Sequence, residues 1–237
     1  MIAGCVLLLY IALMGSFPHE RPHHHRDEKK RDTAFVLPPA VQIGSSNTIV
    51  PVDGYRLKMW REEDGLSRCY LMASVTHRKL IEAFFALVAT VDDQVVDVCL
   101  ESHHANSCGN SDDAPREFWR DDIEPTVLRS YLSMFEDFLL RDGQTGICVV
   151  GKSEVQLTRD KLLLIFGGSH RPAFEAVLQS QGIPNIPNMR FFNEGECHRL
   201  RPPRAEKQFQ EMVHILGAEE EPQNTGQADD EYWKNQN

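Results

Sequence analysis

The sequence predicts a mixed fold, α/β or α+β, in which a single mixed β-sheet of about six to seven strands packs with four to five amphipathic helices. Two patterns predict it. Short apolar runs, alternating or continuous and separated by turn residues, are typical of strands. Longer segments with apolar residues at intervals of three and four are typical of helices that bury one face. With 237 residues, of which 41% are hydrophobic, the chain can form the core of such a domain.

The centre of the predicted sheet is the densest aliphatic stretch of the chain, Thr145–Phe166. Strands are expected at 147–150, 155–157 and 162–166, with a polar turn at 158–161. β-Branched and aliphatic residues favour a pleated, buried backbone. We therefore expect the remaining elements to pack around this stretch.

Further strands are predicted elsewhere in the chain. Tyr55–Trp60 alternates in polarity, and turn residues join it to an apolar run at 69–75, which is typical of a β-hairpin. Val95–Leu100 is almost continuously apolar, so we expect a central strand that is covered on both faces. A short strand is expected at 189–192.

Helices are predicted from apolar periodicity and from residues that start or end helices. The clearest periodicity spans 128–139. In chain order, helices are expected at 80–91 with Thr76 as the N-cap, around Phe118 and Trp119, at 128–139 ending at Gly143, from Pro172 to Gly182, and over 209–216 ending at Gly217.

The chain is expected to have one folded domain with extended ends. Residues 1–16 form a hydrophobic segment that fits a weak export signal, a short anchor or a non-structural extension. Residues 17–48 form a polar, His- and Pro-rich linker that we expect to be disordered. Residues 49–217 form the mixed domain, and residues 218–237 form an acidic, disordered tail.

The six cysteines occur singly, without a C-x-x-C pair. Cys69, Cys99 and Cys148 fall within apolar runs, where a cysteine is typically a small buried thiol rather than one end of a disulfide. We therefore expect a cytoplasmic protein. Export or membrane tethering through residues 1–16 is the alternative.

The net charge of −10 limits the classes of partner. Nucleic acids and anionic membranes are bound by broad clusters of cations, which an acidic chain does not favour. We therefore expect no nucleic-acid partner and no stable membrane insertion. A protein partner of unknown identity remains open.

Residues Gly146–Ser153 satisfy the phosphate-loop pattern G-x-x-x-x-G-K-S, but their context is that of a strand. In a phosphate loop a strand ends before the first glycine, and the Lys-Ser pair opens a helix. Here Ile147–Val150 prefer a pleated backbone, and Ser153 leads into another strand-like alternation. We therefore predict a turn or strand edge at 151–153 and no bound nucleotide.

A candidate site lies at the end of the strand 95–100, where Glu101 and His103 enter a polar loop. Two residues apart on an extended chain, their side chains point to the same side. Carboxylates, imidazoles and thiolates all bind zinc, and many α/β sites form at strand ends. The spacing of the candidate ligands matches no standard zinc signature. These ligands are His103, His104, Cys108, Cys197 and His198.

Asp97 and Glu101 are the candidate catalytic residues. Asp97 lies inside the apolar strand, and a buried carboxylate requires a partner. It either anchors a hydrogen-bond network or belongs to a site with a perturbed pKa, and the network is the favoured interpretation. The adjacent pairs Ser169-His170 and Cys197-His198 lie outside any nucleophile elbow of the form G-x-S-x-G.

These patterns favour a soluble, non-enzymatic binding or interaction protein without a cofactor. The alternative is a metal-dependent, zinc-type hydrolase that uses the loop of Glu101, His103 and His104 together with Cys197 and His198. The two hypotheses differ in whether polar groups from distant segments converge in one pocket. No motif in the sequence assigns the chain to a family.

Overall fold

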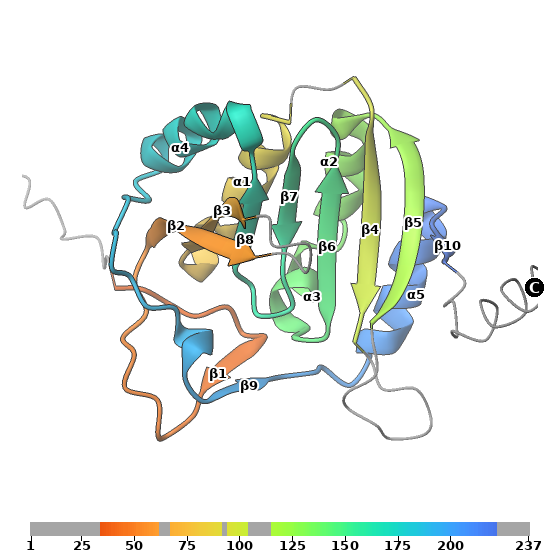
Figure 1. Ribbon diagram of the computed structural model, residues 1–237. Coiled ribbons are helices and arrows are strands. Elements are labelled where there is room, and N and C mark those ends of the chain that lie inside the picture. The colour runs from red at the N-terminus through yellow and green to blue at the C-terminus, as the bar shows by residue number, and fades with distance from the viewer. Residues whose placement is uncertain (1–33, 62–66, 92–93, 104–114, 222–237) are drawn as a thin grey trace, which may run out of the picture. The chain divides into compact units, whose positions relative to one another are not determined.

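The computed structural model describes four stretches of the chain, and they form an α+β structure with a large antiparallel sheet (Figure 1). The described residues are 34–61, 67–91, 94–103 and 115–221. The predicted hydrophobic segment 1–16 and most of the predicted linker lie outside them. Within the described ranges, no helix is long and apolar enough to span a bilayer.

The main sheet has eight strands in the order β10-β5-β4-β6-β7-β8-β3-β2. The mixed helix and strand content is confirmed, but every neighbouring pair of strands is antiparallel rather than mixed. Short connections join β2 to β3, β6 to β7 and β7 to β8, and they require antiparallel neighbours, because parallel neighbours need long crossovers. The strands are β2 (Gly54–Arg61), β3 (Ser67–Ser74), β4 (Val96–Ser102), β5 (Arg116–Ile123), β6 (Thr145–Val150), β7 (Glu154–Leu157), β8 (Leu163–Phe166) and β10 (Glu219–Glu220).

The predicted centre of the sheet is confirmed, because β6, β7 and β8 are consecutive neighbours. The turn at 158–161 joins β7 to β8, as the sequence predicted. Gly146–Val150 lie within β6, and Gly151–Ser153 form the turn into β7. The residues of the phosphate-loop pattern therefore have the predicted strand and turn context, with their backbone paired in the sheet.

The helices cover one face of the main sheet (Figure 1). Inward strand residues such as Val98, Val149 and Val155 are fully buried in a common core with apolar residues from every α-helix of the described chain. Each helix contributes a stripe of apolar side chains at helical spacing. The helices are α1 (His77–Val88), α2 (Pro125–Ser133), α3 (Glu136–Arg141), α4 (Arg171–Ser180) and α5 (Ala205–Leu216).

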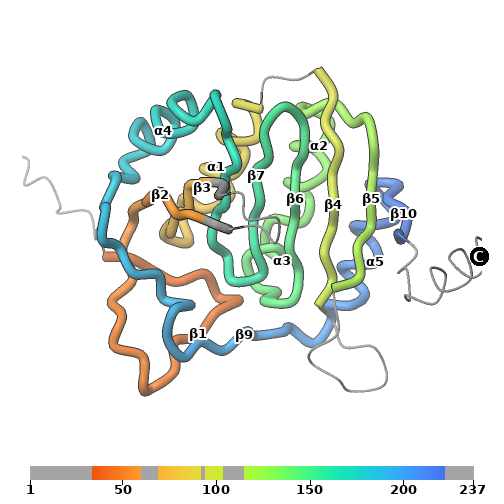
Figure 2. Tube along the Cα trace, in the orientation of Figure 1, coloured from red at the N-terminus to blue at the C-terminus, as the bar shows by residue number. Residues whose placement is uncertain are grey.

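A second, two-stranded sheet pairs β1 (Val41–Ile43) with β9 (Cys197–Arg199), as Figure 2 shows. A smaller apolar cluster lies between it and the main sheet, on the face opposite the helices. Met72 of β3 and Leu164 of β8 belong to this cluster together with Phe191. The small sheet therefore covers the part of that face formed by β3 and β8.

Two short strands lie in segments that were predicted to be linker and tail. β1 precedes the expected domain start at residue 49, and β10 follows its expected end at residue 217. Both are held by partners that are distant in sequence, β9 and β5 respectively. With three and two residues respectively, the strands are too short for a periodic pattern to predict them.

The helix expected around Phe118 and Trp119 is wrong, because both residues lie in β5. Phe118 packs edge-on against Phe209 of α5, with 5.3 Å between the ring centroids, while Trp119 faces away from the helices. Pairing with β4 on one side and β10 on the other decides the conformation of this segment. Tertiary pairing of this kind overrides local preference.

Three smaller predictions are also corrected. The helix at 128–139 is two helices, α2 and α3, that are interrupted at Phe135. The strand expected at 189–192 is absent from the described chain, and a short 3-10 helix begins at Phe192 instead. Thr76 precedes α1 without capping it through its side chain, because its hydroxyl oxygen accepts a hydrogen bond from the Val36 N–H at 2.9 Å.

The Phe118–Phe209 contact leads to a prediction about stability. Phe209→Ala removes a fully buried ring between β5 and α5, so we expect the free energy of unfolding to fall by about 3 to 5 kcal/mol. Urea unfolding followed by circular dichroism measures the loss. Met134→Ala is the control, because Met134 is 66% exposed and its loss should cost less than about 0.5 kcal/mol. Equal losses in the two variants would contradict this packing.

Candidate functional site

The side chains of β4 alternate between the two faces of the main sheet. Val98 and Leu100 are buried beneath the helices, so Asp97, Cys99 and Glu101 point to the opposite face. On that side no described element crosses β7, β6, β4 or β5 (Figure 1). The expectation that this strand is covered on both faces is therefore wrong for the described chain, because the second apolar cluster ends at β8.

We call this uncovered surface the open face. It consists of the outward residues of β7, β6, β4, β5 and β10, and it is rich in carboxylates. The strand register brings them together: Glu101 lies opposite Glu117, and Glu219 lies opposite Trp119. Its carboxylates are those of Asp97, Glu101, Glu117, Glu154 and Glu219.

Two thiols lie among these carboxylates. Cys99 and Cys148 are directly opposite each other on β4 and β6 and are only 2% and 7% exposed. Burial, assisted by the charge of Glu117, raises the pKa of the Cys99 thiol to about 12. Burial and Glu154 also raise the pKa of Cys148, whose Sγ donates to Glu154 Oε1 at 3.3 Å. Both residues are therefore neutral thiols at pH 7 and not nucleophiles.

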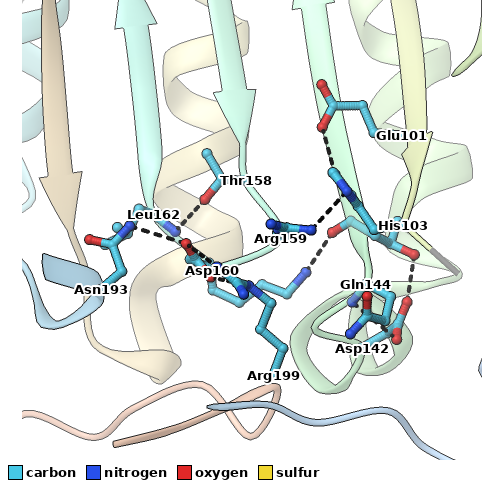
Figure 3. Close-up of polar contacts among 12 residues, drawn as sticks. Glu101, His103, Asp142, Gln144, Thr158, Arg159, Asp160, Leu162, Asn193 and Arg199 are labelled. Atoms are coloured by element: carbon cyan, nitrogen blue, oxygen red, sulfur yellow. Dashed lines mark hydrogen bonds and ion pairs between the residues drawn. The ribbon is translucent and has the colours of Figure 1, made fainter. Parts of the chain in front are cut away.

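Three charged or polar side chains form a chain at the end of β4 (Figure 3). Arg159 Nη1 lies 2.9 Å from His103 Nδ1, and His103 Nε2 lies 3.6 Å from Glu101 Oε2. A guanidinium only donates hydrogen bonds, so His103 Nδ1 accepts one. We therefore assign the imidazole proton to Nε2, on the side that faces Glu101.

Gly146 provides the space that the Glu101 carboxylate occupies. The two residues are directly opposite each other on β4 and β6. A Cβ atom at Gly146 would lie 2.5 Å from Glu101 Oε2. Close approach of this kind requires glycine, which lets the carboxylate lie across the neighbouring strand towards His103.

Arg159 belongs to the charged turn at 158–161, which ties together several segments (Figure 3). Asp160 accepts hydrogen bonds from Arg199 Nε at 2.6 Å and from Asn193 Nδ2 at 3.1 Å. The turn thus connects the main sheet to β9 and to the 3-10 helix that precedes it. We call the cluster at this end of the sheet the polar corner, which consists of Glu101, His103, Asp142, Arg159, Asp160, Lys161 and Arg199.

Lys161 is the most deeply buried cation of the polar corner, with 1% of its surface exposed. Its backbone is left-handed, with φ of 60°, and its Nζ donates to the Thr145 carbonyl at 2.9 Å. Burial lowers the pKa of Lys161 to about 8, against the opposing charges of Asp142 and Asp160. Asp142 is itself buried and accepts a hydrogen bond from the Thr145 hydroxyl at 2.5 Å.

Asp97 has a structural partner. Its Oδ1 accepts a hydrogen bond at 3.0 Å from the N–H of Asp122, whose φ is 54°. The register between β4 and β5 shifts at this point, between Val96 and Val98. Asp97 is half-buried rather than buried, and its one hydrogen bond holds the irregular end of the β4–β5 pair.

The predicted metal ligands that the structure describes, His103, Cys197 and His198, occupy separate places. Cys197 and His198 lie in β9, where Cys197 packs on the second apolar cluster and His198 lies 3.3 Å from Glu196. His103 contacts Arg159 and Glu101 instead. His104 and Cys108 lie outside the described residues. Among the residues that the structure describes, no group of three or more possible ligands is placed to hold a metal ion.

Most residues of the polar corner were not singled out from the sequence. Arg159, Asp160 and Lys161 were predicted only as a polar turn, and Arg199 and Asp142 carried no motif. Three consecutive charged residues between two strongly apolar strands are the signal that could have found the turn.

Comparisons with known proteins give no relative from which to transfer a function. No family model, no curated protein and no solved structure matches the chain. We therefore infer its function from the open face and the polar corner.

The buried thiols lead to a prediction about reactivity. At pH 8, iodoacetamide should alkylate Cys69, which is exposed, and leave Cys99 and Cys148 unmodified in the native protein. Peptide mapping by mass spectrometry measures the labelling at each residue. In urea, where the protein is unfolded, the same reaction should label Cys69, Cys99 and Cys148. Rapid labelling of Cys99 or Cys148 in the native state would contradict the buried, neutral thiols.

Lys161 makes stability depend on pH. Its pKa is about 8 in the folded protein, against an ordinary value of 10.5 for an exposed lysine, so between these values the folded state has lost a proton that the unfolded state keeps. Raising the pH therefore favours the folded state. We expect the unfolding free energy of the native protein, minus that of Lys161→Met, to increase by up to about 3 kcal/mol from pH 8 to pH 10.5. A difference that is independent of pH would contradict this.

Proposed function

We propose that this chain is a non-enzymatic binding protein that receives a cationic polypeptide segment on its open face. The observation that carries the proposal is a row of carboxylates across β7, β4, β5 and β10 on the face that the helices leave free. Opposite charges across an interface favour association and orient the partner. A segment rich in lysine or arginine is the partner that this surface fits.

A hollow of about 610 Å³ at the edge of the open face extends the negative surface. It lies where β5 meets β10, and Trp119 and Arg120 line it together with four acidic residues, Asp121, Glu219, Glu220 and Glu221. An aromatic ring beside carboxylates favours a lysine or arginine side chain, because the ring face and the acids both attract a cation. We infer that one cationic side chain of the partner enters this hollow.

A polypeptide suits the open face better than a small molecule does. The carboxylates are spread over several neighbouring strands, and strands lie about 4.8 Å apart, so a single small ligand reaches only a few of them. The charges also oppose a nucleic-acid partner, because phosphates would face the carboxylates. Both considerations point to a protein segment with several positive charges.

The zinc-type hydrolase remains the alternative prediction, and it has less support. A neutral imidazole has one nitrogen lone pair for a metal, and in His103 that lone pair is on Nδ1, which already accepts a hydrogen bond from Arg159, while Nε2 carries the proton. The guanidinium at 2.9 Å would also repel a metal cation bound at this ring. A binding role for the open face uses the carboxylates without requiring a metal.

Charge removal on the open face tests the proposal. The variant Glu117→Gln, Glu154→Gln and Glu219→Gln keeps the size of each side chain and removes three negative charges. We expect it to bind a fluorescent octalysine peptide at least about tenfold more weakly, since three exposed ion pairs of about 0.5 kcal/mol each sum to one decade in Kd. Fluorescence anisotropy at low ionic strength measures Kd.

The matched control changes the net charge equally on helices. Glu82→Gln, Glu136→Gln and Glu211→Gln alter exposed residues of α1, α3 and α5. We expect this variant to bind octalysine within about twofold of the native protein, because the charges lie on the opposite side of the sheet. Equal weakening in both variants would show attraction by net charge alone and would reject the open face as the binding surface.

A further inference from the structure

We infer that the polar corner contains a binding site for a small carboxylate, centred on the guanidinium of Arg159. The site adjoins the open face, with which it shares Glu101, but it takes an anion through Arg159 and does not depend on the proposed cationic partner. It joins three segments that are far apart in the sequence, namely the end of β4, the turn at 158–161 and β9 (Figure 3).

The other cations of the polar corner are already satisfied. Arg199 binds Asp160 through two of its nitrogens, at 2.6 Å and 3.3 Å. Lys161 is sealed from solvent and donates to the Thr145 carbonyl. Arg159 differs from both, because no carboxylate of the described residues lies within 4 Å of its guanidinium. It is the cation of this cluster that can accept a further anion.

The geometry of Arg159 leaves a donor edge available. Its Nη1 is engaged with His103 Nδ1, and no described residue accepts a hydrogen bond from Nε or Nη2. These nitrogens form a planar fork that matches the two oxygens of a carboxylate. His103 fixes the orientation of the fork, because its ring is held between Arg159 and Glu101. The binding edge is therefore positioned before a ligand arrives.

The electrostatic surroundings of Arg159 also favour an anion. Partial burial, followed by the nearby charge of Arg199, lowers the pKa of Arg159 from its ordinary value. The charges of Asp160 and Glu101 offset part of this effect, and a bound anion would add a further counter-charge at the guanidinium. This contribution reinforces the hydrogen-bonding geometry described above.

The acids of the corner select for a single negative charge. Glu101 approaches the far side of His103 at 3.6 Å, and Asp160 lies beside Arg159 in the same turn. A phosphate dianion would be repelled by both carboxylates more strongly than a monoanion would. The planar carboxylate also matches the guanidinium fork, so we assign the site to a carboxylate rather than a phosphate.

Nuclear magnetic resonance of the arginine Nε–Hε groups tests this site directly. The full chain is titrated with sodium acetate, sodium phosphate or sodium chloride at equal ionic strength. We expect acetate to move the Arg159 signal along a saturating curve that chloride does not reproduce. Phosphate is expected to bind less tightly than acetate.

Variants of Arg159 complete the test. Arg159→Gln should weaken acetate binding, followed through the His103 ring signals, by at least about tenfold, since a charge-assisted bidentate pair is lost. Arg159→Lys keeps the charge but loses the fork, and we expect an intermediate loss. Arg190→Gln is the control, because Arg190 is 61% exposed and pairs with Glu194 rather than with a residue of the polar corner.

The possible outcomes are distinct. Acetate shifts no larger than those of chloride would overturn the site. Tighter binding of phosphate than of acetate would overturn its assignment to carboxylates. Loss of acetate binding in Arg190→Gln as well as Arg159→Gln would show a general charge effect and would also reject it. Octalysine binding by Arg159→Gln should stay at least as tight as that of the native protein, which separates this inference from the proposed function.

Discussion

The ion pair between Asp160 and Arg199 is a charged contact that links the two sheets. It joins the turn between β7 and β8 to β9, and its Nε–Oδ1 distance is 2.6 Å. The side chain of Asp160 is 12% exposed and that of Arg199 is 31% exposed, so solvent screens the two charges only weakly. Removing either side chain by mutation would leave the other charge without a counter-charge. Together with the second apolar cluster, this pair holds β1 and β9 over β3 and β8, and no element of the described chain covers the rest of that face.

The open face follows from the way in which the sheet is built. Helices bury one set of alternate strand residues, and the small sheet covers only part of the other set. The outward positions of β4 and β5 can therefore carry Glu101 and Glu117 without the cost of burying unpaired charges. Cys99 and Cys148 fill the space between these longer side chains as neutral thiols. A surface of this kind is suited to recognising a partner by charge.

The polar corner shows how the fold accommodates charges that it partly buries. Lys161 is satisfied by the Thr145 carbonyl, and burial holds its pKa near 8, which costs stability at neutral pH. Arg159 is partly buried as well, but its contact is the neutral ring of His103 rather than an acid. Clusters of strained or poorly compensated groups often mark binding sites, because a ligand can supply the missing partner. The contrast between these two cations is what distinguishes a structural role from a binding role.

The sequence by itself determined the elements whose patterns are strong and local. The strands within Thr145–Phe166, the hairpin of β2 and β3, and the helices ended by Gly182 and Gly217 are encoded in periodicity and in residues that end helices. Only the tertiary structure decided that Phe118 and Trp119 form a strand, because pairing with β4 and β10 outweighs the local preference. The same holds for the site. Glu101 and His103 were singled out from their spacing along one strand. Arg159 and Arg199 come from distant segments that are brought to the polar corner only by the tertiary fold, so no local sequence pattern predicts them.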